Sequence, residues 1–172
     1  MVVLVVLAKV FASFFLGLLS YWFVGQLIDR NWSSASKGFD TTLEKLVIPK
    51  SKFTREVLIW CHEYIRSSDV EIPSLKLNYR PSQRCLGNYN SARNEIVIHI
   101  KNIRTVRELC EVILHEYHHS RQKATGLDEN YDRMGEKYGY VNNPFEVEAR
   151  RVAKMNVDQC LRDIFGDLTL HN

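Results

Sequence analysis

The chain has 172 residues, a length that suits one compact domain with a short appendage. Hydrophobic residues make up 45% of the sequence and charged residues 25%, so we expect a packed core rather than a disordered chain. The net charge of +3 is too small to favour a nucleic-acid-binding protein, and no nucleic acid is predicted as a partner.

Residues 1–30 differ from the rest of the chain because they are almost wholly apolar, with Lys9 as the only charge before residue 29. Residues 10–28 reach the roughly 20 residues that a helix needs to cross a bilayer. Tyr21 and Trp22 lie near the end of this stretch, where aromatic side chains meet lipid headgroups. The sequence therefore predicts a hydrophobic helix that anchors the chain in a membrane. A cleaved signal sequence and a buried core helix are the alternatives.

Residues 31–50 begin with small polar side chains and are predicted to be a linker to a soluble domain over residues 51–172. Three cationic residues, Arg30, Lys37 and Lys45, follow the apolar stretch and slightly outnumber the positive charges before it. Positive charge is more common on the cytoplasmic side of a membrane helix, so a cytoplasmic soluble domain is favoured.

The first half of the soluble domain is predicted to contain one helix and a small sheet. Residues 51–67 carry apolar side chains at mostly helical spacing. Residues 75–79 alternate apolar and polar side chains, residues 85–89 are a weaker strand candidate, and residues 90–94 have the composition of a turn. Residues 95–100 give the clearest strand signal in the chain.

The strand at residues 95–100 has two distinct faces. Because side chains alternate along a strand, Ile96 and Ile98 share one face with Ile100, while Val97 and His99 share the other. His99 is therefore interpreted as an exposed strand residue rather than a metal ligand.

Two further helices are predicted from their start signals. Thr105 and Glu108 have the spacing of a capping box, so a helix should begin there and continue to about residue 122. Residues 123–142 are polar and contain three glycines, which indicates a loop with at most a short helical piece. Asn143, a good N-cap, precedes a proline and should begin the last long helix, which is expected to end near residue 165.

The four cysteines, Cys61, Cys85, Cys110 and Cys160, are too far apart in sequence to form a C-x-x-C motif. Three of them fall in predicted helices, where a free cysteine usually packs as a small apolar residue. A disulfide is the alternative if the domain is exported.

The strongest motif is His115-Glu116-Tyr117-His118-His119, which matches H-E-x-x-H. Residues four apart on a helix differ by only about 40° around its axis, so His115 and His119 point the same way and can share one metal ion. Glu116 lies beside this pair, where a carboxylate can take a proton from a metal-bound water. His115 and His119 are therefore predicted metal ligands, and Glu116 is the predicted general base.

A site of this kind needs a third ligand, and the last helix offers Glu146 and Glu148. Glu146 is in line with Arg150 and Lys154 at spacings of four, as on a solvated, ion-paired face. Glu148 shares its stripe with apolar residues, where a carboxylate is costly unless it is paired or bound to a cation. These apolar residues are Phe145, Ala149, Val152 and Met155. Glu148 is therefore the predicted ligand. Two imidazoles and one carboxylate suit Zn²⁺ best but would also accept cobalt or manganese.

These residues resemble the gluzincin peptidases, especially minimal H-E-x-x-H zinc metallopeptidases and their SprT-like and ImmA/IrrE-like relatives. The resemblance covers residues 54–160 and rests on the H-E-x-x-H helix, on the segment 87–89 that leads into strand 95–100, and on the later segment 143–149. It implies an α+β, zincin-like fold, in which the edge strand of a small antiparallel sheet packs on the H-E-x-x-H helix and a glutamate-bearing helix. The family's ligand glutamate is often followed by alanine, as Glu148 is here.

The resemblance also suggests how a substrate would bind. The family runs an exposed edge strand beside the metal, which corresponds here to Ile96, Val97, Ile98 and His99. A transition-state donor in the family is often a tyrosine or histidine, and Tyr138 and Tyr140 are candidates by location alone.

The predicted function is that of a zinc-dependent metallopeptidase, which hydrolyses peptide bonds in a peptide or protein substrate with a metal-activated water. The alternative is a membrane-tethered metal-binding or protein-binding module without catalytic activity. A DNA-associated protease would need a localised basic surface, and Lys101, Arg104 and Arg107 indicate one only weakly.

Overall fold

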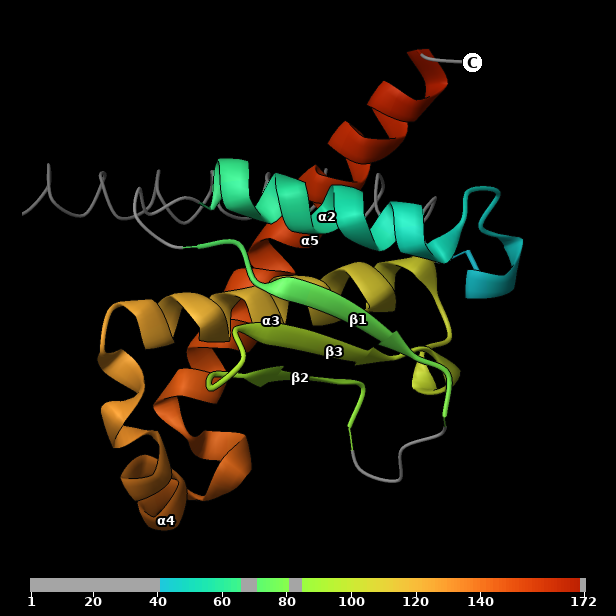
Figure 1. Cartoon of the computed structure of the whole chain (residues 1–172). Coiled ribbons are helices and arrows are strands. Elements are labelled where there is room, and N and C mark those ends of the chain that lie inside the picture. Colours follow the sequence, from blue (N-terminus) through green and yellow to red (C-terminus); the bar gives the residue numbers. More distant parts are fainter. Residues whose placement is uncertain (1–40, 66–70, 81–84, 171–172) are drawn as a thin grey trace, which may run out of the picture. The chain divides into compact units, whose positions relative to one another are not determined.

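The structure, a computed structural model, describes residues 41–65, 71–80 and 85–170 (Figure 1). In these ranges no helix combines the length and the apolar character needed to span a bilayer. The membrane helix predicted at residues 10–28 lies outside the described residues.

A three-stranded mixed sheet forms one side of the described domain (Figure 1). Its strands are β1 (Ser74–Asn78), β2 (Gly87–Asn90) and β3 (Glu95–His99), in the order β1-β3-β2. β2 pairs with β3 antiparallel through the tight turn 91–94, whereas β1 pairs with β3 parallel. The expectation of an antiparallel sheet is therefore wrong for one of the two pairings, because alternating side chains reveal a strand but not its neighbour or direction.

The strand β3 has the predicted alternation of faces but not the predicted position in the sheet. Ile96 and Ile98 are fully buried, whereas Val97 and His99 are half-buried. Since β3 lies between β1 and β2, it is the central strand and not the edge. Ile100, also buried, begins a short 3₁₀ helix, η3 (Ile100–Asn102), rather than ending the strand.

Within the described residues, four α-helices accompany the sheet: α2 (Lys50–Tyr64), α3 (Val106–Ala124), α4 (Tyr131–Asn142) and α5 (Pro144–Leu170). The predicted start of α3 is confirmed, because the Glu108 backbone N–H donates to Thr105 Oγ1 at 3.0 Å. The start of α5 is confirmed too: the Phe145 backbone N–H donates to Asn143 Oδ1 at 3.1 Å. However, α5 continues beyond the predicted end near residue 165, because Gly166 does not interrupt it.

The segment 127–142 is helical, where the sequence predicted mainly loop. A 3₁₀ helix, η4 (Leu127–Asn130), leads into α4, which contains one residue in a non-helical conformation, Gly139 (φ 73°, ψ 164°). None of the residues of α4 is buried. Gly135 and Gly139 lower the helix propensity of this segment, and this explains why its composition suggested a loop.

α3 is the central helix of the described domain, since it packs on β2 and β3 and against both α2 and α5. The core is made of buried apolar residues from α2, β3, α3 and α5: Phe53, Val57, Ile96, Ile98, Leu109, Ile113, Val157 and Leu161. Leu43, from the stretch predicted as a linker, is also buried, and its backbone N–H donates to the Arg104 carbonyl at 2.8 Å. Cys61, Cys110 and Cys160, the three cysteines in helices, are buried free thiols, as predicted.

Candidate metal centre

Two histidines of α3 bring their ring nitrogens together. His115 and His119 lie one helical turn apart, and their Nε2 atoms are separated by 3.1 Å. Their rings meet edge to face, with centroids 4.7 Å apart. The helix that the capping box begins therefore places both imidazoles as the motif predicts.

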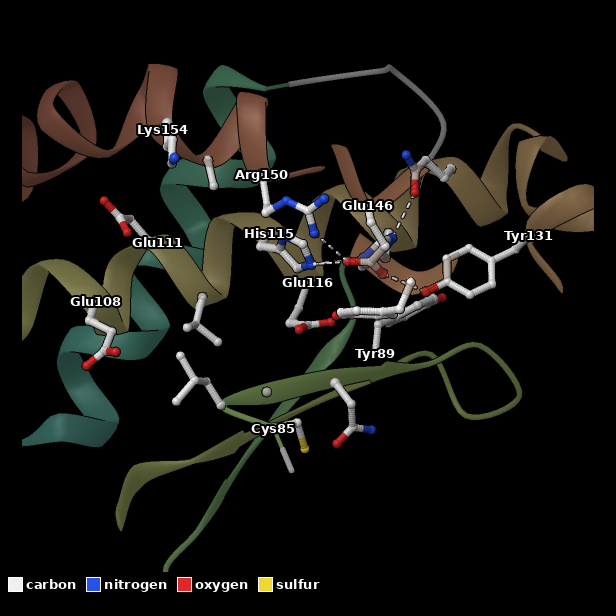
Figure 2. Close-up of a pocket in the computed structure, with 18 of the residues that line it drawn as sticks. Cys85, Tyr89, Glu108, Glu111, His115, Glu116, Tyr131, Glu146, Arg150 and Lys154 are labelled. Atoms are coloured by element: carbon white, nitrogen blue, oxygen red, sulfur yellow. Dashed lines mark hydrogen bonds and ion pairs between the residues drawn. The ribbon is translucent and has the colours of Figure 1, made fainter. Parts of the chain in front are cut away.

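Glu146, in the first turn of α5, completes the group (Figure 2). Its Oε2 atom lies 3.3 Å from His115 Nε2, and its Oε1 atom lies 3.2 Å from His119 Nε2. One donor atom from each of the three residues lies within 4.8 Å of the others, and this group could hold a metal ion. Two imidazoles and a carboxylate are the donor set of many catalytic zinc sites.

The structure places Glu148 away from this group, which corrects the predicted third ligand. The Glu148 side chain is 45% exposed, and its Oε2 atom lies 3.5 Å from His118 Nε2. The inner face of α5 instead follows the buried residues Glu146, Ala149, Ala153 and Val157. The predicted inner face included larger apolar residues that lie on the other side of the helix, such as Met155, which is 57% exposed. Small alanines mark the inner face of α5, where it packs against α3.

The surroundings of Glu146 fit a bound cation. Glu146 is 2% exposed, and its Oε2 atom is buried without a hydrogen-bond partner. The Tyr131 hydroxyl donates to Oε1 at 2.6 Å, and Arg150 Nη1 lies 3.6 Å from Oε2. Burial by itself would raise the pKa of Glu146, but His115, His119 and Tyr131 together lower it well below its usual range. The carboxylate is therefore ionised and directed at the two imidazoles.

Glu116 lies on the same side of α3 as His115 and His119, and all three line one cleft. It is 7% exposed, and this burial raises the pKa of its carboxyl group. The neighbouring imidazoles lower this pKa, and so does a hydrogen bond from the Tyr89 backbone on β2. Together they lower it by less than burial raises it. Glu116 thus lies beside the candidate metal centre without belonging to its three ligands, which is the position that the motif predicts for it.

The candidate metal centre opens into a cleft of about 1160 Å³ (Figure 2). Its walls come from α3, α4, the start of α5 and the strand β2, which contributes Gly87, Asn88 and Tyr89. The strand at the edge of the sheet beside the cleft is therefore β2. The predicted substrate strand, Ile96 to His99, is wrong in this respect, because β3 is covered by a strand on each side.

Three tyrosines of α4 have different relations to the cleft. Tyr140, one of the two predicted donors, lines it, and partial burial together with the Glu146 carboxylate raises its pKa to about 12. Tyr138 is absent from the lining, and Lys137 Nζ lies 4.9 Å from its ring centroid. Tyr131 lines the cleft and was missed, since a segment interpreted as loop gave no reason to single it out.

Gln122 was also missed as a site residue. Its Oε1 atom lies 2.8 Å from His119 Nδ1, on the side of the ring opposite to Glu146. The spacing could have revealed it, because Gln122 follows His119 by three residues on the same helix.

The chain matched no protein-family model, no curated protein and no solved structure. Its function is therefore inferred from its own residues and their geometry.

Proposed function

We propose that the chain is a zinc-dependent peptidase. The observation that carries this proposal is the convergence of two imidazole nitrogens and one buried carboxylate beside a second buried carboxylate, Glu116, in one cleft. His115, His119 and Glu146 would hold the ion. Zinc, when bound at such a site, polarises a carbonyl group and lowers the pKa of water toward about 7.

Glu116 would act as the general base and then as the general acid. Its buried carboxyl group has a raised pKa, which suits a group that must both accept and return a proton near neutral pH. It would take the proton of the attacking water and pass it to the amine that leaves when the peptide bond breaks. Tyr131 and Tyr140 line the same cleft, and their hydroxyl groups are the candidate donors to the substrate oxygen.

The substrate would bind as an extended peptide along β2. Among the described strands, β2 pairs only with β3, so its other edge can accept main-chain hydrogen bonds from an added strand. Its residues Gly87 to Tyr89 line the cleft that contains Glu116. A peptide in this position would present its main chain to the candidate metal centre.

Cleavage assays on the zinc-loaded full chain test the proposal. The substrates would be fluorescently labelled denatured casein and a mixed peptide library, with products identified by mass spectrometry. We expect slow but zinc-dependent cleavage, which Glu116→Gln should reduce by at least about 100-fold, as expected for loss of a general base. The same variant should retain one zinc ion per chain.

Two results would contradict the proposal. Equal cleavage by wild type and Glu116→Gln would show that Glu116 is not the base. Stoichiometric zinc without cleavage of any substrate would favour the alternative, a metal-binding or protein-binding module without catalytic activity.

A further inference from the structure

On the Nδ1 side of the His119 ring, a short chain of hydrogen bonds runs through Gln122. Gln122 is 2% exposed, so its amide group must find its partners inside the protein. Its Nε2 atom donates to the Phe145 carbonyl at 3.2 Å and to Glu148 Oε2 at 3.2 Å. Its Oε1 atom lies 2.8 Å from His119 Nδ1.

These contacts allow only one orientation of the amide. The Phe145 carbonyl and the Glu148 carboxylate can only accept hydrogen bonds, so the NH₂ group of Gln122 must face them. The amide oxygen, which is only an acceptor, then faces His119 Nδ1. The 2.8 Å contact is a hydrogen bond only if Nδ1 carries a proton.

The consequence lies on the other side of the imidazole ring. In a neutral ring with a proton on Nδ1, Nε2 has a free lone pair. That Nε2 atom is the one 3.1 Å from His115 Nε2 and 3.2 Å from Glu146 Oε1. Of the two neutral tautomers of His119, Gln122 therefore selects the one whose Nε2 lone pair can bind a metal ion.

We propose that Gln122 is a positioning residue that fixes the tautomer and ring orientation of His119, and that Glu148 acts through Gln122 by fixing its amide. This inference rests on the proposed function for its purpose, but the contacts of Gln122 fix its amide orientation in the metal-free protein as well. Metal-binding histidines commonly donate their second ring N–H to such a partner, and loss of the partner typically costs about 10–100-fold in metal affinity.

The first variant is Gln122→Met, which keeps the size of the side chain and removes both its donor and its acceptor. We expect its zinc affinity, measured by competition with a chromogenic chelator, to fall by about 10–100-fold. Nitrogen NMR of the metal-free chain should show His119 protonated at Nδ1 in the wild type and a loss of that preference in the variant. Gln159→Met, on an exposed position of α5, is the matched control and should change neither quantity.

A second pair of variants separates positioning from packing. Gln122→Glu keeps an acceptor for His119 but sets a carboxylate against Glu148 where the amide donated. It should therefore weaken zinc binding. Adding Glu148→Gln supplies a donor on the other side, so the double variant should recover most of the zinc affinity and the Nδ1-protonated form of His119. Simple loss of packing would not be rescued by this exchange.

The outcomes distinguish this inference from the proposed function. If the wild type binds no zinc, the proposed function is wrong, and the tautomer measurement alone decides the role of Gln122. If the wild type binds zinc and Gln122→Met binds it equally well with His119 unchanged, the positioning role is wrong while the metal site stands. Failure of the double variant to recover affinity over Gln122→Glu would overturn the role of Glu148.

Discussion

Glu146 occupies an unusual place for an ionised carboxylate, because α5 otherwise buries mainly apolar side chains along the same face. Taking a charge out of water is costly unless it is paired or bound to a cation. Tyr131, Arg150 and the two histidines supply partial compensation, yet Oε2 still lacks a hydrogen bond. A divalent cation between the imidazoles would satisfy the atom that the protein leaves without a donor.

Two variants test directly which of the two glutamates of α5 is the metal ligand. Glu146→Gln removes the charge of the buried side chain and should reduce zinc content from about one ion per chain to nearly none. Glu148→Gln should keep its zinc, because an amide oxygen can still accept the hydrogen bond from Gln122. Elemental analysis of the purified full chain gives both values. If Glu148→Gln lost its zinc while Glu146→Gln kept it, Glu148 would be the ligand and Glu146 would not belong to the site.

Helices and strands with a signal in their own residues could be predicted from the sequence. Features that depend on contacts with distant segments could not. Thr105 and the alternating residues of β3 are local signals, and both have the structure that the sequence indicates. The order of the strands depends on pairing between distant segments, which alternation does not encode. Likewise, the choice of Glu146 over Glu148 depends on which face of α5 meets α3, and small residues such as Ala153 mark that face only weakly.

The approach of β2 to α3 depends on Gly87. A Cβ atom at this position would lie 2.7 Å from Val112 Cγ1, 3.2 Å from Ile98 Cδ1 and 3.3 Å from Glu116 Cγ. Two of these neighbours are buried core side chains with little room to move. Gly87 therefore lets the edge strand lie directly on the helix that carries Glu116.

We expect Gly87→Ala to lower the free energy of unfolding by about 1–3 kcal/mol, the usual cost of overpacking. It should also reduce any cleavage activity, because β2 and Glu116 would move apart. Gly166→Ala is the matched control: a Cβ atom there meets nothing within 4 Å, and alanine is the better helix former. Urea denaturation monitored by circular dichroism measures both variants. Equal stability of Gly87→Ala and wild type would show that the contact is easily relaxed.

For the whole molecule, we expect the apolar residues 10–28 to anchor the described domain to a membrane. We predict that the full chain fractionates with membranes and resists extraction by alkaline carbonate, as a spanning helix does. Intact mass spectrometry of the same sample tests the main alternative. A chain shortened at its N-terminus and found in the soluble fraction would identify a signal sequence, and release of the full-length chain by carbonate would contradict the anchor.

The same two helices build the core and hold the candidate metal ligands. α3 contributes Leu109 and Ile113 to the core and His115 and His119 to the site, while α5 supplies Glu146 from the face that packs on α3. An ion held there binds only when both helices are in place, so binding and folding are thermodynamically linked. At a free zinc concentration 100 times the dissociation constant, this linkage adds about 2.7 kcal/mol to the stability of the fold. If the site holds zinc as we propose, scarcity of metal in a cell would limit the lifetime of the protein as well as any activity.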